Sequence, residues 1–538
     1  MKWNLGDILD RLAHVGDPDR PALIHGDRRL SWAELDRRSN NLARNLAALG
    51  VGPGAKAAFY LRNVPEYIEF LAASLKGRLT HVNVNYRYKA AELLYILDNS
   101  DAEVVVYDAE FRPNVEAVRA QASGVRAWVE VGGGATAPSI DYEALASAGD
   151  GAPLGLQRDP DDPILIYTGG TTGLPKGVIW THDILMSAQL RSLASVNGTA
   201  PPDSLEAFLE HVRERGQFGR QLPAAPLMHA TGMTVAMGAM VAGGTVVTLP
   251  TTSRFDADEL WDEVARHRVT SITIVGDAFA KPMLAALEAA PGRRDLSCVQ
   301  SIVSSGVVWS APVKRGLIAH LPDALLLDSL GSTEAPACGA SITTRDGEVS
   351  ATLDFRVGPE CRVFDDDDVE VEPGSGRIGY MARTGFIPLG YYKDEAKTRQ
   401  TFKTINGVRY AIPGDLCTVE ADGRLVLLGR RSACINTGGE KVFAEEVEEV
   451  IKDHPDIEDA NVIGVPDERW GQAVVAVVAP RPGSACSEAE LRDFVRARLA
   501  GYKVPKRLFF RESLERFPNG KPNYDRMRAV AQEAMGIG

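Results

Sequence analysis

Cysteine is scarce in this chain, with six residues among 538, and no two of them form a C-x-x-C pair or another metal-ligand spacing. Scattered cysteines of this kind do not indicate the disulfide framework of a secreted protein or a structural zinc cluster. We therefore expect buried free thiols in a reducing cytosol. The six residues are Cys298, Cys338, Cys361, Cys417, Cys434 and Cys486.

Long apolar runs are also missing. A membrane-spanning helix needs roughly 18 or more uninterrupted apolar residues, and the longest weakly polar stretch, Ala230–Pro250, is broken by Gly and Thr. That stretch predicts a buried helix followed by a strand. The N-terminal residues M-K-W-N-L-G-D-I-L-D-R-L predict an amphipathic helix rather than a signal peptide. These patterns predict a soluble, cytoplasmic protein without stable membrane insertion.

The chain has fewer basic than acidic residues: 59 Lys and Arg against 72 Asp and Glu, which gives a net charge of −13. Nucleic acids and acidic membrane surfaces would repel such a chain as a whole. Neither is therefore expected as the main partner, although an anionic nucleotide could bind at a local positive site. The sequence does not determine the oligomeric state, and a homodimer is one of the alternatives.

The chain is too long for one hydrophobic core, because single cores stop growing near roughly 250–300 residues. Helical patterns of 10–15 residues alternate with short apolar strands in the first part, which is typical of helix-covered parallel sheets. Turns and short strands dominate after about residue 350. We predict an α/β fold with a large N-terminal region of stacked sheets and a β-rich subdomain over residues 1–430. A small, mobile α+β domain is predicted over residues 431–538.

One strand runs into a loop that is unusually rich in glycine and threonine, Y-T-G-G-T-T-G-L-P-K-G at Tyr167–Gly177. Backbone N–H groups and hydroxyls in such a loop can cradle phosphate oxygens, and Lys176 would add a point charge. The P-loop fingerprint fails, because Lys176 follows Pro175 and precedes Gly177. On its own, the segment could also be a flexible loop without a ligand.

Further motifs along the chain favour a ligand-binding role for this loop. The chain contains P-L-M-H-A-T-G-M with His229, D-S-L-G-S-T-E-A with Thr333 and Glu334, and I-P-G-D with Asp415. L-L-G-R-R-S-A-C-I-N-T-G-G-E-K-V and F-P-N-G-K-P-N-Y follow, the latter with Lys521. In order and spacing these motifs resemble the adenylate-forming superfamily of acyl-CoA synthetases, peptide-synthetase adenylation domains and luciferases. The resemblance extends over essentially the whole chain.

The resemblance implies a two-step reaction with ATP, Mg²⁺ and CoA. A carboxylate first displaces pyrophosphate from ATP to give an acyl-adenylate, and a thiol then displaces AMP. Catalysis of this kind relies on positioning and on charge stabilisation. By resemblance, Lys521 reaches the cleft and bridges the substrate carboxylate and the α-phosphate, whereas its structural alternative is an ordinary surface lysine. His229 would gate the acyl pocket, and its alternative is a buried core histidine.

The remaining roles also follow from the resemblance. Phosphate binding is expected at Thr168, Gly169, Gly170, Thr171, Thr172 and Lys176, with Thr333 on the α-phosphate and Glu334 on Mg²⁺. The nucleoside is expected against Asp328, Leu330, Gly331, Ser332, Asp415 and Arg430. The CoA arm would pass Gly438, Gly439 and Glu440, and the acyl pocket would be lined by His229, Phe279, Gly306 and Val307.

Two positions depart from the family pattern. Leu330 stands where an aromatic residue usually stacks on adenine, so stacking of about 1–3 kcal/mol would be lost there. Ser432 stands at the expected hinge between the two domains, where many relatives carry Asp or Lys. A small polar residue can still absorb the backbone rotation.

The sequence narrows the thiol acceptor and the carboxylic acid substrate without identifying either of them. A free-standing chain with a glycine-lined segment near Gly438 favours CoA over a carrier protein. Small apolar residues in the expected pocket favour a hydrophobic monocarboxylic acid, either a fatty acid or a bulky steroid or diterpenoid acid. The other classes are a carrier-loading adenylating enzyme, a luciferase-like oxygenase and a nucleotide-binding relative without activity. The run Asp365–Asp368 is interpreted as a solvated hairpin end rather than a metal site.

Overall fold

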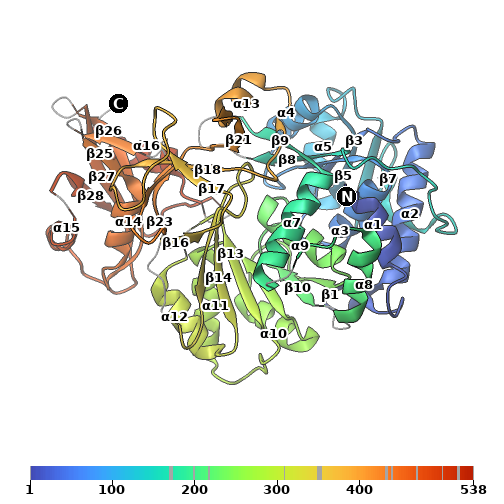
Figure 1. Cartoon of the computed structure of the whole chain (residues 1–538), viewed down its shortest axis with the longest axis horizontal. Coiled ribbons are helices and arrows are strands. Elements are labelled where there is room, and N and C mark those ends of the chain that lie inside the picture. Colours follow the sequence, from blue (N-terminus) through green and yellow to red (C-terminus); the bar gives the residue numbers. More distant parts are fainter. Residues whose placement is uncertain are drawn as a thin grey trace.

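The computed structural model describes residues 2–168, 174–197, 200–215, 219–307, 309–347, 354–430, 434–437, 440–467, 471–499, 501–517 and 521–536. Three sheets form the fold. Two of them belong to a large region, and the third, with its helices, forms a smaller lobe that is orange to red in Figure 1. The fold predicted from the sequence, a large stacked-sheet region and a small C-terminal α+β domain, is confirmed.

The first sheet has 15 strands within the described ranges and runs through the large region from β2 to β20. Its strands β1, β11, β10, β12, β13 and β14 are parallel, and from β14 to β20 its neighbours run antiparallel. The strands of this sheet are β1 (Pro21–His25), β2 (Arg28–Ser31), β10 (Arg220–Pro223), β11 (Thr245–Thr248), β12 (Ser271–Ile274), β13 (Ser301–Ser305), β14 (Leu325–Leu330), β15 (Gly339–Thr343), β16 (Asp354–Val357), β17 (Cys361–Phe364), β18 (Gly379–Arg383), β20 (Phe402–Ile405), β21 (Val408–Ala411), β22 (Asp415–Val419) and β23 (Leu425–Arg430).

The second sheet has eight strands within the described ranges: β9 pairs antiparallel with both β8 and β19, and the other pairs are parallel. Its parallel strands each lead into a helix or a long connection, as expected for helix-covered sheets. The strands are β3 (Lys56–Tyr60), β4 (Thr80–Asn83), β5 (Ala102–Asp108), β6 (Ala127–Val131), β7 (Ile140–Asp141), β8 (Pro163–Thr168), β9 (Lys176–Thr181) and β19 (Gly390–Tyr391).

The largest core lies between these two sheets and includes apolar side chains of α1, α2, α3 and α9. A second core packs α10, α11 and α12 on the first sheet, and a third packs α4 and α5 on the second sheet. The helices of the large region are α1 (Leu5–Leu12), α2 (Trp32–Ala48), α3 (Pro65–Lys76), α4 (Ala90–Ser100), α5 (Arg112–Arg119), α6 (Tyr142–Ser147), α7 (His182–Asn197), α8 (Leu205–Arg215), α9 (Ala230–Val241), α10 (Ala257–His267), α11 (Asp277–Ala289), α12 (Ala311–His320) and α13 (Glu395–Thr401), with the short 3-10 helix η1 (Ala109–Phe111).

The third sheet carries a core on each face, one under α14 and α15 and the other under α16. Its long hairpin β26–β27 is almost wholly apolar along the buried positions, which explains why this small lobe has its own core. Its elements are β24 (Cys434–Thr437), β25 (Glu440–Phe443), α14 (Ala444–Lys452), β26 (Ile457–Asp467), β27 (Gly471–Pro480), α15 (Glu488–Arg496), η3 (Gly501–Lys503), β28 (Arg507–Phe510) and α16 (Tyr524–Met535).

Local sequence signals account for several of these elements. Ser31 caps α2 and Glu34 closes a capping box on it, as the S-W-A-E pattern predicts. Asp365 ends a hairpin, with its carboxylate accepting from the N–H groups of Asp367 and Val369, so the hairpin interpretation of this acidic run is confirmed. No helix within the described ranges has the length and apolar character that a bilayer span requires.

The cysteine prediction holds in part. Cys338, Cys361 and Cys417 are buried free thiols, as expected. Cys298 and Cys486 are also free, but both are half-exposed, which corrects the expectation that they would be buried. Each packs against a hydrophobic core from its partly buried margin, Cys298 on the core under α10, α11 and α12 and Cys486 on the core under α14 and α15.

Candidate active site

The predicted site residues of the first sheet meet at one edge. Ligands of open parallel sheets bind where the carboxyl ends of the strands lie side by side. Strands β10, β12, β13 and β14 are neighbours and parallel, so the segments that follow them share this edge. These segments carry His229 after β10, Phe279 after β12, Gly306 after β13 and Gly331 after β14.

The segment before His229 is held by Asn63, which lies in the loop after β3, and by Asn83 of β4. The side chain of Asn63 donates to the carbonyls of Pro223 and Ala225, each at 3.1 Å, and accepts from the N–H of Leu227 at 2.8 Å. Asn83 donates to the carbonyl of Met228 at 2.6 Å. The segment that positions His229 at the N-cap of α9 is therefore fixed between both sheets.

The side chain of His229 is half-buried, and its Nε2 is shielded from solvent. Its Nε2 has no hydrogen-bond partner among the described residues. Burial lowers the pKa of His229 to about 3, with further lowering by the positive charges of Lys521 and Arg87. A buried polar atom without a partner is the kind of group that a ligand oxygen would satisfy. Lys521, from the small lobe, is exposed.

The phosphate loop connects two paired strands. Thr168 ends β8 and lies opposite Lys176, the first residue of β9. Asn83 fixes the end of β8 by accepting from the N–H of Tyr167 at 2.6 Å, and Tyr95 donates to the carbonyl of Pro175 at 3.0 Å. Both ends of the loop are therefore anchored, and Asn83 joins the first of them to the segment that carries His229.

A chain of polar contacts connects Lys176 to Glu334. Lys176 forms an ion pair with Asp394, which caps α13 by accepting from the N–H of Lys397 at 2.9 Å. The hydroxyl of Tyr391 donates to Oε1 of Glu334 at 2.8 Å. Tyr391 belongs to β19, which pairs with β9, so the phosphate loop and the loop after β14 are joined through one short strand.

Gly331 permits a close approach in the loop that carries Ser332, Thr333 and Glu334. A Cβ atom on Gly331 would lie 2.8 Å from the backbone nitrogen of Ala337 and 2.9 Å from the carbonyl oxygen of Ala335. Real Cβ atoms do not approach backbone atoms so closely. The glycine is therefore required by packing, and the half-buried Ser332–Glu334 segment faces the edge where the other site residues meet.

The expected nucleoside contacts fall on two strand ends. Leu330 ends β14 and is buried in the largest core. Asp415 begins β22, is buried, and lies directly opposite Arg430 of β23. This register places the two predicted ribose-binding residues side by side on the backbone.

Asp328 has a protein partner that the sequence did not indicate. Lys314 of α12 donates to its carboxylate at 3.1 Å, and both side chains are buried. Burial raises the pKa of Asp328 to about 6 although Lys314 opposes that rise. The pair ties α12 to β14, next to the expected adenine position.

Apolar side chains lie at the expected acyl pocket, and Gly306 beside them is exposed. Phe279 packs against Phe255 with ring centroids 4.7 Å apart, and Val307 packs on the same core. Gly306 adopts φ +89°, and a Cβ atom there would meet nothing within 4 Å. The backbone after β13 thus leaves open space at the edge shared with His229.

Several predicted residues lie outside the described residues: Gly169, Gly170, Thr171, Thr172, Ser432, Gly438 and Gly439. Glu440 begins β25, and the N–H of Phe517 donates to the carbonyl of Lys521 at 2.9 Å.

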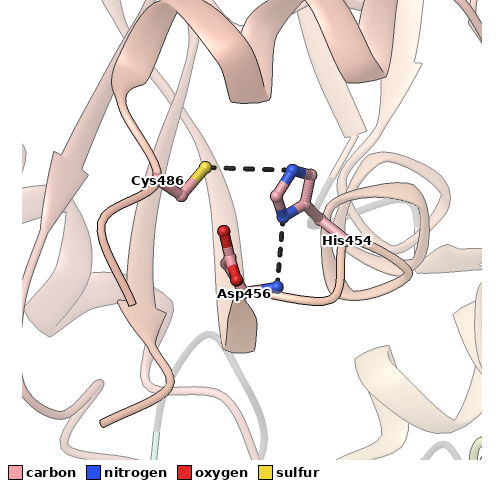
Figure 2. Close-up of side chains that lie close together, drawn as sticks. All are labelled: His454, Asp456 and Cys486. Atoms are coloured by element: carbon pink, nitrogen blue, oxygen red, sulfur yellow. Dashed lines mark hydrogen bonds between the residues drawn. The ribbon is translucent and has the colours of Figure 1, made fainter. Parts of the chain in front are cut away.

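A second group of potential metal ligands lies in the small lobe, away from this edge. The side chains of His454, Asp456 and Cys486 approach one another, with their ligand atoms within 4.8 Å (Figure 2). Nδ1 of His454 accepts from the N–H of Asp456 at 3.2 Å, and Nε2 faces the thiol at 3.9 Å. A metal-bound imidazole instead donates from its second nitrogen. The arrangement favours a local hydrogen-bonded turn, and we assign no metal to it.

Comparison with known proteins identifies the family. The sequence matches the AMP-binding enzyme family over residues 12–392 and the AMP-binding enzyme C-terminal domain over residues 446–521. The chain belongs to the AMP-binding enzyme family. The predicted membership of the adenylate-forming superfamily is thereby confirmed.

Curated relatives place the chain among acid–thiol ligases. It is 40% identical over 533 residues to the medium/long-chain-fatty-acid–CoA/3-oxocholest-4-en-26-oate–CoA ligase of Mycobacterium marinum, covering 96% of this chain and 95% of that protein. It is 39% identical to the 3-oxocholest-4-en-26-oate–CoA ligase of Rhodococcus rhodochrous, covering 97% and 95%. The predicted enzyme class, an AMP-forming acyl-CoA synthetase, agrees with these relatives and is confirmed.

Solved structures support the fold and add a detail on domain arrangement. ATP-bound MatB from Rhodopseudomonas palustris superimposes with a TM-score of 0.82 at 25% identity, covering 99% of this chain and all of that one. The apo form of the same enzyme gives 0.72 at the same identity and coverage. The overall arrangement of this chain is thus more similar to the ATP-bound form.

The sequence missed several residues that position the site, namely Asn63, Asn83, Lys314, Tyr391 and Asp394. Asn83 had a detectable signal, because it is a polar residue at the end of the buried strand T-H-V-N. Asp394 has the position of an ordinary N-cap, and its pairing with Lys176 spans 218 residues, which no local pattern reveals.

Proposed function

We propose that this protein is an ATP-dependent acyl-CoA ligase that activates a hydrophobic monocarboxylic acid. The observation that carries the proposal is the arrangement around His229. The Nε2 of His229 is shielded from solvent and has no partner among the described residues, and Asn83 joins the segment before His229 to the end of β8, where the expected phosphate loop begins. The ligase relatives support this assignment.

In the first step, a carboxylate oxygen of the acid attacks the α-phosphorus of ATP, and the bond to pyrophosphate breaks. Thr168 and Lys176 would hold the leaving phosphates and Thr333 the α-phosphate. Lys521 would bridge the carboxylate and the α-phosphate, where its charge offsets the negative charge that develops on phosphorus. Asp415 and Arg430 would hold the ribose hydroxyls.

Glu334 fits a Mg²⁺ site, because it is a half-buried carboxylate at the phosphate edge and Tyr391 orients it through Oε1. Carboxylate and phosphate oxygens are the ligands that Mg²⁺ prefers. The ion would supply charge neutralisation of the phosphates when bound. The role of Tyr391 is then to keep the carboxylate of Glu334 in one orientation.

In the second step, the CoA thiol loses its proton and its sulfur attacks the acyl carbon, so that AMP leaves. The segment Asn436–Val442 would line the route of the CoA arm. We propose a large domain over residues 1–430 and a small domain over 431–538, with a rotation near Ser432 between the two steps. The resemblance to the ATP-bound form of MatB supports the view that the arrangement described here serves the first step.

The acid is proposed to be a medium- or long-chain fatty acid or a steroid side-chain acid. The apolar packing of Phe279 and Val307 and the activities named for the relatives support this range. A panel of such acids, assayed with ATP, Mg²⁺ and CoA by mass spectrometry, tests the proposal. Formation of acyl-CoA, AMP and pyrophosphate supports it. Pyrophosphate without acyl-CoA would instead indicate a carrier protein as acceptor.

A further inference from the structure

Asp394 lies beside the phosphate-binding lysine and is not among the residues to which the reaction assigns a role. Its two carboxylate oxygens have separate partners: Oδ1 accepts from the N–H of Lys397 at the start of α13, and Oδ2 pairs with Lys176. The side chains of Lys176 and Asp394 are 39% and 27% exposed, so incoming phosphates can reach the pair. Lys176 holds the pKa of Asp394 below its usual range, which keeps the carboxylate charged.

The segment around Asp394 is fixed to the same strand that begins with Lys176. The N–H of Tyr392 donates to the carbonyl of Gly177 at 2.7 Å, and β19 pairs with β9. The hydroxyl of Thr398 donates to the carbonyl of Asp394 at 2.8 Å and accepts from the N–H of Tyr391 at 2.9 Å. Asp394 therefore cannot swing away easily, whereas Lys176 has a long flexible stem.

We propose that Asp394 is a displaceable counter-ion for Lys176: the lysine leaves this carboxylate for the phosphates of ATP and returns to it when pyrophosphate departs. The proposal rests on the assigned phosphate-binding role of Lys176. A fixed negative charge beside the phosphate site opposes tight binding of both ATP and pyrophosphate. Asp394 thus positions Lys176 and limits retention of the product rather than contacting the reacting atoms.

The substitution Asp394→Asn tests this directly, because the amide keeps an oxygen for the N–H of Lys397 but removes the charge. We expect Kd for Mg-pyrophosphate and KM for ATP to fall by about two- to fivefold, the range set by a partly exposed ion pair. KM for the acid should stay unchanged. A merely structural role would leave pyrophosphate affinity unchanged or weaken it.

Two further variants make the test specific. Asp101→Asn is the matched control, because Asp101 holds the neighbouring Tyr392 and Lys393 side chains at 2.8 and 2.7 Å without contacting Lys176. It should leave pyrophosphate affinity unchanged. In a Lys176→Gln background, Asp394→Asn should no longer strengthen pyrophosphate binding.

Calorimetric titration of Mg-pyrophosphate separates this inference from the proposed function. If the unmodified protein binds pyrophosphate and exchanges it into ATP, but Asp394→Asn binds it equally or more weakly, the counter-ion role is wrong and the ligase assignment stands. An unmodified protein that neither binds nor exchanges pyrophosphate overturns the ligase assignment and this role together.

Discussion

Single residues at this site are constrained by backbone contacts as much as by chemistry. Gly331 illustrates this, since the loop that carries Thr333 and Glu334 folds back on the backbone of Ala335 and Ala337. The motif D-S-L-G-S-T-E-A could be identified from the sequence. The reason for its glycine could not, because the contact forms only when the loop between β14 and β15 closes.

Gly331→Ala should therefore destabilise the chain by about 1–3 kcal/mol, the usual cost of overpacking, and lower turnover by roughly 100-fold through displacement of Glu334. Urea unfolding and steady-state assays measure the two effects. Gly238→Ala in α9 is the control, because its nearest neighbour would be Nε2 of Gln189 at 3.8 Å. That variant should be unchanged or more stable by about 0.5–1 kcal/mol. Equal behaviour of the two variants would contradict the packing account.

Pairs of elements around the nucleotide edge are joined by buried polar contacts. Lys314 and Asp328 tie α12 to β14 in the interior of the first sheet. Removing one partner of a buried pair leaves the other charge unpaired, which is costly. The periodic pattern of V-K-R-G-L-I-A-H-L predicts the helix, but it gives no sign that Lys314 points inward.

Asp328→Asn should accordingly lower the free energy of unfolding by about 3–5 kcal/mol. The double substitution Asp328→Leu with Lys314→Met should recover most of that loss, because it removes both charges. Lys403→Met, at the half-exposed pair with Asp368, is the control and should cost less than about 1 kcal/mol. The measurement is denaturant unfolding of the unmodified protein, Asp328→Asn, the double variant and Lys403→Met. A double variant as unstable as Asp328→Asn would show that the ion pair is not the cause.

The helices and strands could largely be predicted from local sequence signals. The capping box at Ser31 and the alternation of helical and strand patterns are examples. The site was predicted from motif resemblance, and the roles proposed for Thr168, Lys176 and Glu334 rest on the motif in which each of them lies. Contacts between distant segments, such as Asn63 with the segment before His229, depend on how the two sheets stack. Periodicity and propensity describe single elements, so they do not contain this information.

At the scale of the whole molecule, the small lobe is docked on the large region in one arrangement. Lys281 of α11 donates to the carbonyl of Glu458 in β26 at 2.8 Å, which joins the two parts. The two proposed steps need different positions of the small domain. The arrangement described here should support adenylate formation alone.

A reducible cross-link tests this separation of steps. Cysteines at positions 281 and 458, in a Cys298→Ser and Cys486→Ser background, can be joined by a short bis-methanethiosulfonate reagent. The linked protein should retain pyrophosphate exchange but lose acyl-CoA formation by about tenfold or more, since rotation is blocked. Reduction should restore it. Full acyl-CoA synthesis in the linked protein would contradict a rotation between the steps.

The most direct test of the account is acid-dependent exchange of pyrophosphate into ATP, compared between the unmodified protein and Lys521→Ala, with Lys403→Ala as a control lysine. The account predicts exchange that requires a hydrophobic carboxylic acid and that falls by about 100-fold or more in Lys521→Ala, as expected when a charge that stabilises the transition state is removed. Lys403→Ala should match the unmodified protein. Undiminished exchange in Lys521→Ala would contradict the claim that this lysine completes the adenylation site.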